Sequence, residues 1–172
     1  MNIILNKKNV NPVIFDQYCD LNIRLLNQSD NKSLVEHFSR LDKDDAYLRF
    51  NMYISENSID VYLSRIDWEK NNFIGFFDDN NILRGVSQLS ATEEKQIASL
   101  GISVEKLYQS KGFGFCLLIS SVSYAKDKGY NYIAIEYAAR NYRILSWVKR
   151  AGFNIKRRGC EMSSIFSTSS IK

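Results

Sequence analysis

Gln109-Ser110-Lys111-Gly112-Phe113-Gly114 is the stretch of this sequence that decides its fold. It lies between an apolar run that ends at Val104 and a segment with the apolar spacing of a helix. The first N–H groups of a helix have no partner within it and carry the positive end of its dipole. The two glycines leave these groups open to a large anion, and Lys111 adds a positive charge. The stretch therefore predicts a pyrophosphate site at the start of a helix.

Two other phosphate-binding motifs do not fit these residues. A P-loop needs Gly-Lys followed by Ser or Thr, and the dinucleotide fingerprint needs three glycines where only two are in register here. Two glycines at a strand–helix junction also occur where they only permit a tight turn. The glycines alone therefore leave phosphate binding and a plain turn both open.

The apolar periodicity on either side predicts an α+β domain. Predicted strands cover residues 21–25, 73–77, 82–89, 97–104 and 132–137, and predicted helices cover 29–41, 56–66, 112–128 and 141–150. Gly129 is expected just past the end of the long helix, and a closing hairpin begins at Phe153 with Gly159 at its turn. The order of elements predicts a mixed sheet with helices on both faces.

The length of 172 residues suits one domain, which we place at residues 21–172. Residues 1–20 are interpreted as an arm or an edge strand. Their apolar run is too short for a signal peptide, and no stretch reaches the roughly 18 apolar residues that span a bilayer. We therefore expect a cytoplasmic protein without a membrane segment.

Cysteine and histidine usage argues against a disulfide framework and a metal site. Cys19, Cys116 and Cys160 are odd in number and far apart, and His37 is the only histidine. A Ser-His-Asp hydrolase would need His37 as its base. Because His37 lies in an amphipathic helical pattern, we expect it on the surface or boundary of a helix instead.

Several landmarks, in order and on matching elements, resemble the GNAT N-acetyltransferases over about residues 20–165. The family's acetyl-CoA motif, Gln/Arg-x-x-Gly-x-Gly/Ala, follows a strand and opens a helix. The residues that carry the resemblance are Ile23-Arg-Leu25, Ser29-Asp30, Tyr47-Leu-Arg-Phe50, Ala98–Val104, Gln109–Gly114 with Leu117-Leu118, Ala125–Gly129, Asn141 and Ala151-Gly-Phe153.

This resemblance implies a mostly antiparallel sheet of six to seven strands, splayed between the fourth and fifth strands. It implies acetyl-CoA as co-substrate and no metal. The pantetheine would pair with backbone groups of Ile102 and Val104. Asn141 would also reach the coenzyme. The pyrophosphate would lie on the amides of Gln109, Ser110, Lys111, Gly112, Phe113 and Gly114.

The resemblance further implies direct transfer of the acetyl group to a primary amine of a small molecule, a protein lysine or an N-terminus, with the Val104 N–H stabilising the oxyanion. Two usual catalytic positions differ here. Val148 replaces the family's general-acid tyrosine, and Ser99 lies near the position of a frequent glutamate. Substitute acids are Tyr142, Tyr137 and Cys116, and substitute bases are Glu136 and Glu105; packing or surface roles would explain each of them too.

Other functions stay open at this point. A non-catalytic acyl-CoA-binding regulatory module would share the same motif, and so would a nucleotide-binding domain unrelated to CoA. The carboxylates of Asp42, Asp44 and Asp45 either attract a cationic amine or form a solvated helix end. Lys156-Arg-Arg158 is interpreted as an exposed hairpin, so nucleic acid is not expected. The oligomeric state is open, with a homodimer as one candidate.

Overall fold

The computed structural model describes residues 22–170, so the predicted arm of residues 1–20 and Cys19 lie outside it. The elements in chain order are β1 (Asn22–Leu25), η1 (Gln28–Asp30), α2 (Asn31–Ser39), α3 (Lys43–Phe50), α4 (Glu56–Ser64), β2 (Asn71–Phe77), β3 (Leu83–Ala91), β4 (Ile97–Val104), η2 (Lys106–Tyr108), α5 (Phe113–Asp127), β5 (Tyr132–Ala138), α6 (Tyr142–Ala151), β6 (Asn154–Arg158), β7 (Glu161–Ser167) and η3 (Thr168–Ser170). No helix among them is long and apolar enough to cross a membrane.

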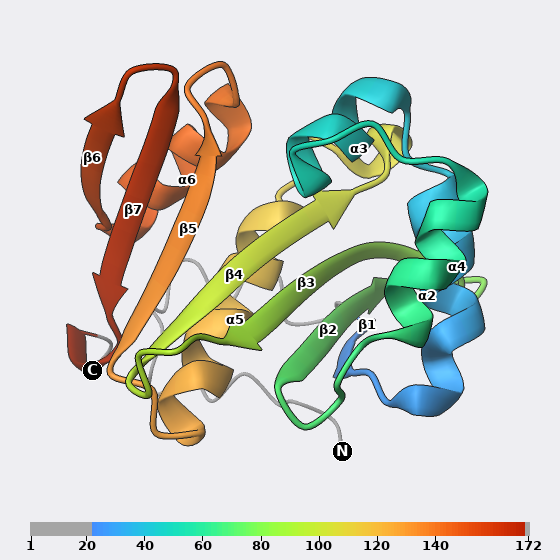
Figure 1. The fold of residues 1–172 in the computed structure, drawn as a ribbon, viewed down its shortest axis with the longest axis horizontal. Helices are drawn as coiled ribbons and strands as arrows, with labels where there is room; N and C mark the ends of the chain where they lie inside the picture. Colours follow the sequence, from blue (N-terminus) through green and yellow to red (C-terminus); the bar gives the residue numbers. More distant parts are fainter. Residues whose placement is uncertain (1–21, 171–172) are drawn as a thin grey trace.

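Seven strands form one mixed sheet in the order β1-β2-β3-β4-β5-β7-β6 (Figure 1). Every neighbouring pair is antiparallel except β4 and β5, which run parallel. The helix α5 connects these two strands, because parallel neighbours need a crossover between them. The predicted strand–helix–strand unit of residues 97–137 is thus confirmed.

The parallel pairing between β4 and β5 is short. Only three residue pairs are in register, the last of them Ser99 with Ala134, although β4 continues to Val104 and β5 to Ala138. Beyond this point the two strands diverge and leave a V-shaped opening in the sheet (Figure 1). The predicted splay between the fourth and fifth strands is confirmed.

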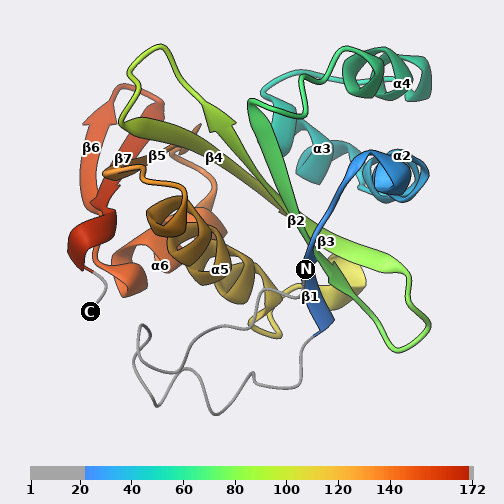
Figure 2. The ribbon, with the colours of Figure 1, turned by 90° about the horizontal axis from the view of Figure 1, so that it is seen from below.

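The helices cover opposite faces of the sheet (Figure 2). On one face α5 packs on the central strands with α6 beside it, and on the other lie α2, α3 and α4. Each face has its own apolar core: Leu117, Leu118 and Val148 belong to the first, and Phe38 and Phe73 to the second. The predicted α+β class with helices on both faces is confirmed.

The prediction of only two helices between the first two strands was wrong, because the described chain forms a third one, α3. Asp42 caps this helix, since its Oδ1 accepts a hydrogen bond of 2.8 Å from the Asp45 N–H. Of its eight residues only Ala46 is buried, so the segment shows no long apolar stripe in the sequence. Its helix depends on the cap and on packing against the sheet.

A buried charge network connects the end of β4 with α2 and β3. Glu105 accepts hydrogen bonds from Arg40 Nε at 2.8 Å and from Arg84 Nη1 at 2.9 Å. Arg84 also donates to Asp78 in the β2–β3 turn, at 2.8 Å. Burial raises the pKa of the Glu105 carboxyl, but the bonds from His37, Arg40 and Arg84 outweigh it and lower that pKa below its usual value.

The network predicts a pH-dependent contribution of Glu105 to stability. Because its pKa is lowered in the folded protein, the stabilisation is present at neutral pH and is lost as pH falls through the folded pKa. We expect Glu105→Gln to destabilise the protein by about 1–3 kcal/mol at pH 7, because it removes the buried charge that accepts hydrogen bonds from Arg40 and Arg84. Urea unfolding should show this difference shrinking toward pH 3.

Glu93→Gln is the matched control, since Glu93 is exposed. It should change the free energy of unfolding by less than about 0.5 kcal/mol at either pH. Equal destabilisation by Glu105→Gln at both pH values would show that the charge of Glu105 contributes nothing.

Candidate active site

The edge of β4 presents free backbone groups to the gap that opens between β4 and β5. The Glu105 N–H donates to Arg84 O at 2.9 Å, in the same register that pairs Val104 with Gly85. Hydrogen-bonded and non-bonded pairs alternate along antiparallel strands, so Ile102 and Val104 occupy non-bonded positions relative to β3. Their N–H and C=O groups therefore point toward β5, whose registered pairing has ended at Ala134.

The start of α5 lies beside this edge and has no side-chain cap. Its N-cap is Gly112, in the left-handed conformation with φ of 89°, whereas α3, α4 and α6 each begin with a side-chain hydrogen bond. Ser110 is also left-handed, with φ of 59°. Uncapped N–H groups at a helix start bind anions readily, and exposed Lys111 adds a positive charge.

Phe113 and Gly114 each have a role in local packing. Phe113 stacks on Phe76 with 4.0 Å between ring centroids. A Cβ atom at Gly114 would lie 2.3 Å from the Trp147 ring, so this glycine lets α6 approach α5. Any phosphate contact at these two residues would therefore use the backbone, and the Gly114 position has a structural reason of its own.

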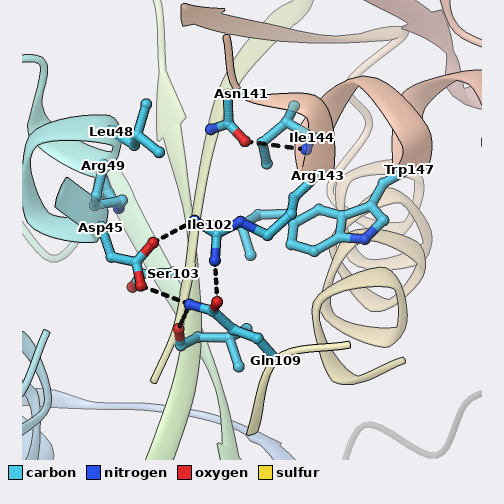
Figure 3. Close-up of a pocket in the computed structure, with 11 residues that line it drawn as sticks. Asp45, Leu48, Arg49, Ile102, Ser103, Gln109, Asn141, Arg143, Ile144 and Trp147 are labelled. Atoms are coloured by element: carbon cyan, nitrogen blue, oxygen red, sulfur yellow. Dashed lines mark hydrogen bonds and ion pairs between the residues drawn. The ribbon is translucent and has the colours of Figure 1, made fainter. Parts of the chain in front are cut away.

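A pocket opens where α3, β4 and α6 converge, and it encloses about 370 Å³ of space, part of it open to solvent. Figure 3 shows side chains from these three elements meeting across the strand. The lining residues are Asp45, Leu48, Arg49, Ile102, Ser103, Val104, Gln109, Asn141, Arg143, Ile144 and Trp147. Of the predicted cofactor residues, the structure thus brings together Ile102, Val104, Gln109 and Asn141.

A polar cluster crosses the mouth of the splay (Figure 3). Gln109 Nε2 donates to Asp45 Oδ2 at 2.6 Å and to Val104 O at 2.8 Å. Arg143 donates to Gln109 Oε1 and pairs with the Asp45 carboxylate. The interpretation of Asp45 as part of a solvated helix end was wrong: the Arg143 side chain reaches it from α6, so the carboxylate is nearly buried and paired. Gln109 connects the two helices to the end of β4.

Asn141 has a structural role in addition to lining the pocket. Its Oδ1 accepts a hydrogen bond of 3.2 Å from the Ile144 N–H and so caps α6. Asn141 is buried, whereas its neighbour Tyr142 is 75% exposed and does not line the pocket. The cap holds the start of α6 at the open end of the splay, on the side opposite α3.

The candidate acids and bases lie in very different surroundings. Glu136 is exposed on β5 and lies outside the pocket lining. Tyr137 donates or accepts a hydrogen bond with Ser164 Oγ at 2.9 Å, within the core. Burial raises the pKa of the Cys116 thiol to about 12, and Val148 is fully buried. None of these groups reaches the pocket.

The expectation that His37 lies on the surface or boundary of a helix was wrong. His37 is fully buried, because α2 packs this face on the sheet, and both ring nitrogens have polar partners. Nε2 lies 2.9 Å from Ser103 Oγ in the pocket wall, and Nδ1 lies 3.3 Å from Glu105 Oε1. The paired Glu105 carboxylate only accepts hydrogen bonds, so Nδ1 carries the proton and Nε2 accepts from the Ser103 hydroxyl.

Among the described residues, histidine, cysteine and carboxylate side chains nowhere gather in threes that could hold a metal ion. The pocket contains three residues of α6 that the sequence did not indicate, Arg143, Ile144 and Trp147. Ser103 lies within the Ala98–Val104 stretch, but its place in the pocket wall was not expected. Arg49 belongs to the Tyr47-Leu-Arg-Phe50 stretch, but nothing in the sequence indicated that its side chain would face the pocket. These residues gain their positions only when side chains from α3 and α6 meet across the gap beside β4.

By sequence, the chain matches no protein-family model and no curated protein. Its structure matches the GNAT domain of PAT from S. lividans with a TM-score of 0.73 and 16% identity, over 86% of this chain and 90% of that one. The chain has the GNAT fold.

Two further solved structures are similar to this chain. Spermidine N-acetyltransferase from Vibrio cholerae, in complex with CoA and spermine, has a TM-score of 0.70 and 17% identity, over 87% of this chain and 96% of that one. A putative acetyltransferase from Salmonella typhimurium with its cofactor acetyl-CoA has a TM-score of 0.68 and 11% identity, over 87% and 94%. The splay and the uncapped helix start described above thus belong to a GNAT fold.

The contact between Gly114 and Trp147 predicts that the effect of Gly114→Ala on the free energy of unfolding depends on the residue at position 147. Gly114→Ala should destabilise the protein by about 1–2 kcal/mol, because overpacking outweighs the gain of up to about 1 kcal/mol in helix propensity. In a Trp147→Leu background the same substitution should be neutral or stabilising. Urea unfolding of the four proteins measures this coupling, and equal effects in both backgrounds would contradict it.

Proposed function

We propose that this protein is an acetyl-CoA-dependent N-acetyltransferase that acts on a primary amine. The observation that carries the proposal is the unpaired edge of β4, at Ile102 and Val104, next to the uncapped start of α5. An extended ligand with amide groups and a pyrophosphate fits this pair of features, since the edge binds amides as an added strand would. The proposal is supported by two proteins of similar structure, one in complex with CoA and the other with acetyl-CoA.

The residues present can hold each part of acetyl-CoA. The backbone groups of Ile102 would bind the pantetheine and leave the Val104 N–H for the thioester, while Gln109 already occupies the Val104 carbonyl. The backbone amides of residues 109–114 and the Lys111 side chain would bind the pyrophosphate. Asn141, at the opposite wall, would contact the coenzyme. When bound, acetyl-CoA supplies a thioester carbonyl, whose developing charge the Val104 N–H would stabilise.

Ser103 is the group we propose to accept a proton from the amine. An ammonium has no lone pair, so an amine of pKa about 10 must lose a proton to react. Ser103 is part of the pocket lining, and its own proton can pass to neutral His37, which Glu105 orients. Glu105 would thus act through His37 rather than as the base itself. Glu136 and Tyr142 lie outside the pocket, so they could act as base or acid only if the acceptor bound outside it.

The second candidate function is a non-catalytic acyl-CoA-binding module. It is favoured by Val148, which stands where the family's acid is usual and lies fully buried in the core. Release of free thiol from acetyl-CoA, measured with a panel of amines, separates the two functions. CoA binding without amine-dependent thiol release would support the module.

The phosphate site can be tested with an isosteric pair of variants, Gly112→Asp and Gly112→Asn. Both residues tolerate the left-handed conformation that Gly112 adopts, so they differ mainly in charge. We expect the Asp variant to bind CoA at least about tenfold more weakly than the Asn variant by titration calorimetry, because like charges repel. Equal affinities, with both variants folded by circular dichroism, would exclude this helix start as the phosphate site.

Ser103→Ala tests the proton path. We expect kcat for thiol release at pH 7.5 to fall by about 10²-fold, with unchanged affinity for CoA. Burial lowers the pKa of His37, and the charged groups that face it are Glu105, Arg40 and Arg49. The acidic limb of the rate should therefore move to higher pH in the variant, toward the pKa of the amine. An unshifted profile would contradict the path, even if kcat falls.

A further inference from the structure

Arg49 places a largely buried guanidinium at the wall of the pocket. It extends from α3 and lies over Gly101 of β4, where a Cβ atom would be 2.8 Å from its Cζ. Side chains at successive positions of a strand point to opposite faces. Gly101 and Ser103 therefore face α2 and α3, whereas Ile102 and Val104 pack with the α5 side. The missing side chain of Gly101 makes the room that the guanidinium fills.

The charge of Arg49 has no counter-ion among the side chains that the structure describes. None of their carboxylates forms an ion pair with it, although the other pocket arginine, Arg143, pairs with Asp45. Its Nη2 donates to Gln88 Oε1 at 2.5 Å, and its buried Nε has no partner. Burial accordingly lowers the pKa of Arg49 from its usual value. A buried cation without a counter-ion is costly, so an anion at this position would be favourable.

This positive charge is separate from the predicted phosphate site. The start of α5 lies on one face of the sheet and α3 on the other (Figure 2). The ring of Phe50, 4.9 Å from Arg49 Cζ, supports the guanidinium and holds it in place. An anion bound there would therefore belong to the second substrate rather than to the CoA phosphates.

We propose that Arg49 binds a carboxylate of the acceptor, so that the acceptor is a small primary amine that carries a carboxylate. The inference rests on the proposed acetyltransferase function. Guanidinium groups match carboxylates through paired hydrogen bonds. The Asp45 carboxylate does not cancel this attraction, because Arg143 and Gln109 already bind it. The pocket is small, since its volume of about 370 Å³ includes space open to solvent, so a small acceptor fits it best.

Pairs of acceptors that differ only in the anionic group test the proposal. We would compare 4-aminobutyrate with 4-amino-1-butanol, and 6-aminohexanoate with 6-amino-1-hexanol, and add spermidine as a cationic amine. The native protein should prefer the carboxylate member of at least one pair by about tenfold or more in kcat/KM for thiol release. A preference for the amino alcohols or for spermidine would overturn the proposal without any variant.

Arg49→Gln should reduce this preference to about one, and Arg49→Lys should keep part of it, because lysine retains the charge but not the paired donors. Arg65→Gln is the matched control, since Arg65 is exposed at the end of α4, outside the pocket. An unchanged preference in folded Arg49→Gln would overturn the proposal.

The two levels of the hypothesis fail differently. Acetylation of both members of each pair at equal rates would refute the role of Arg49 and leave the acetyltransferase intact. The absence of both CoA binding and thiol release would refute the proposed function itself.

Discussion

The early end of the pairing between β4 and β5 is the constraint on which the site depends. A parallel pair in the middle of a sheet normally satisfies its backbone groups along its whole length. Here the register stops at Ser99 and Ala134, and the inward-facing groups of Ile102 and Val104 have no strand beside them. At this divergence an uncapped helix end, a free strand edge and a pocket lie together.

Ion pairs between charged side chains hold the elements around this opening together. Glu105 accepts from two arginines and fixes the end of β4 against α2 and β3. Asp45 is bound by Arg143 and Gln109, which joins α3 to α6. After these pairings one cation of the pocket, Arg49, has no carboxylate among the described residues. The site thus combines a neutral strand edge, which suits pantetheine, with a positive wall on the face of α3.

Much of the fold could be predicted because local patterns agreed with the tertiary structure. The strand of residues 97–104 was predicted with its observed bounds, and Gly129 adopts the expected left-handed conformation. The segment of α3 was missed because only Ala46 of its residues is buried. His37 was misplaced because its helical pattern resembles that of a surface residue. Only the folded chain brings Ser103 and Glu105, both more than 60 residues away, to its two nitrogens.

The sequence by itself determined the order of the elements and the glycine-rich helix start that marks the GNAT fold. These features depend on local spacing and backbone freedom, which neighbouring residues specify. Only the tertiary structure decided which side chains form the pocket wall. In the folded chain Gly114 is required because Trp147 packs against it, and Arg49 has no carboxylate partner among the described side chains. Such pairings depend on how α3 and α6 approach β4, and contacts between elements so distant in sequence have no local signature.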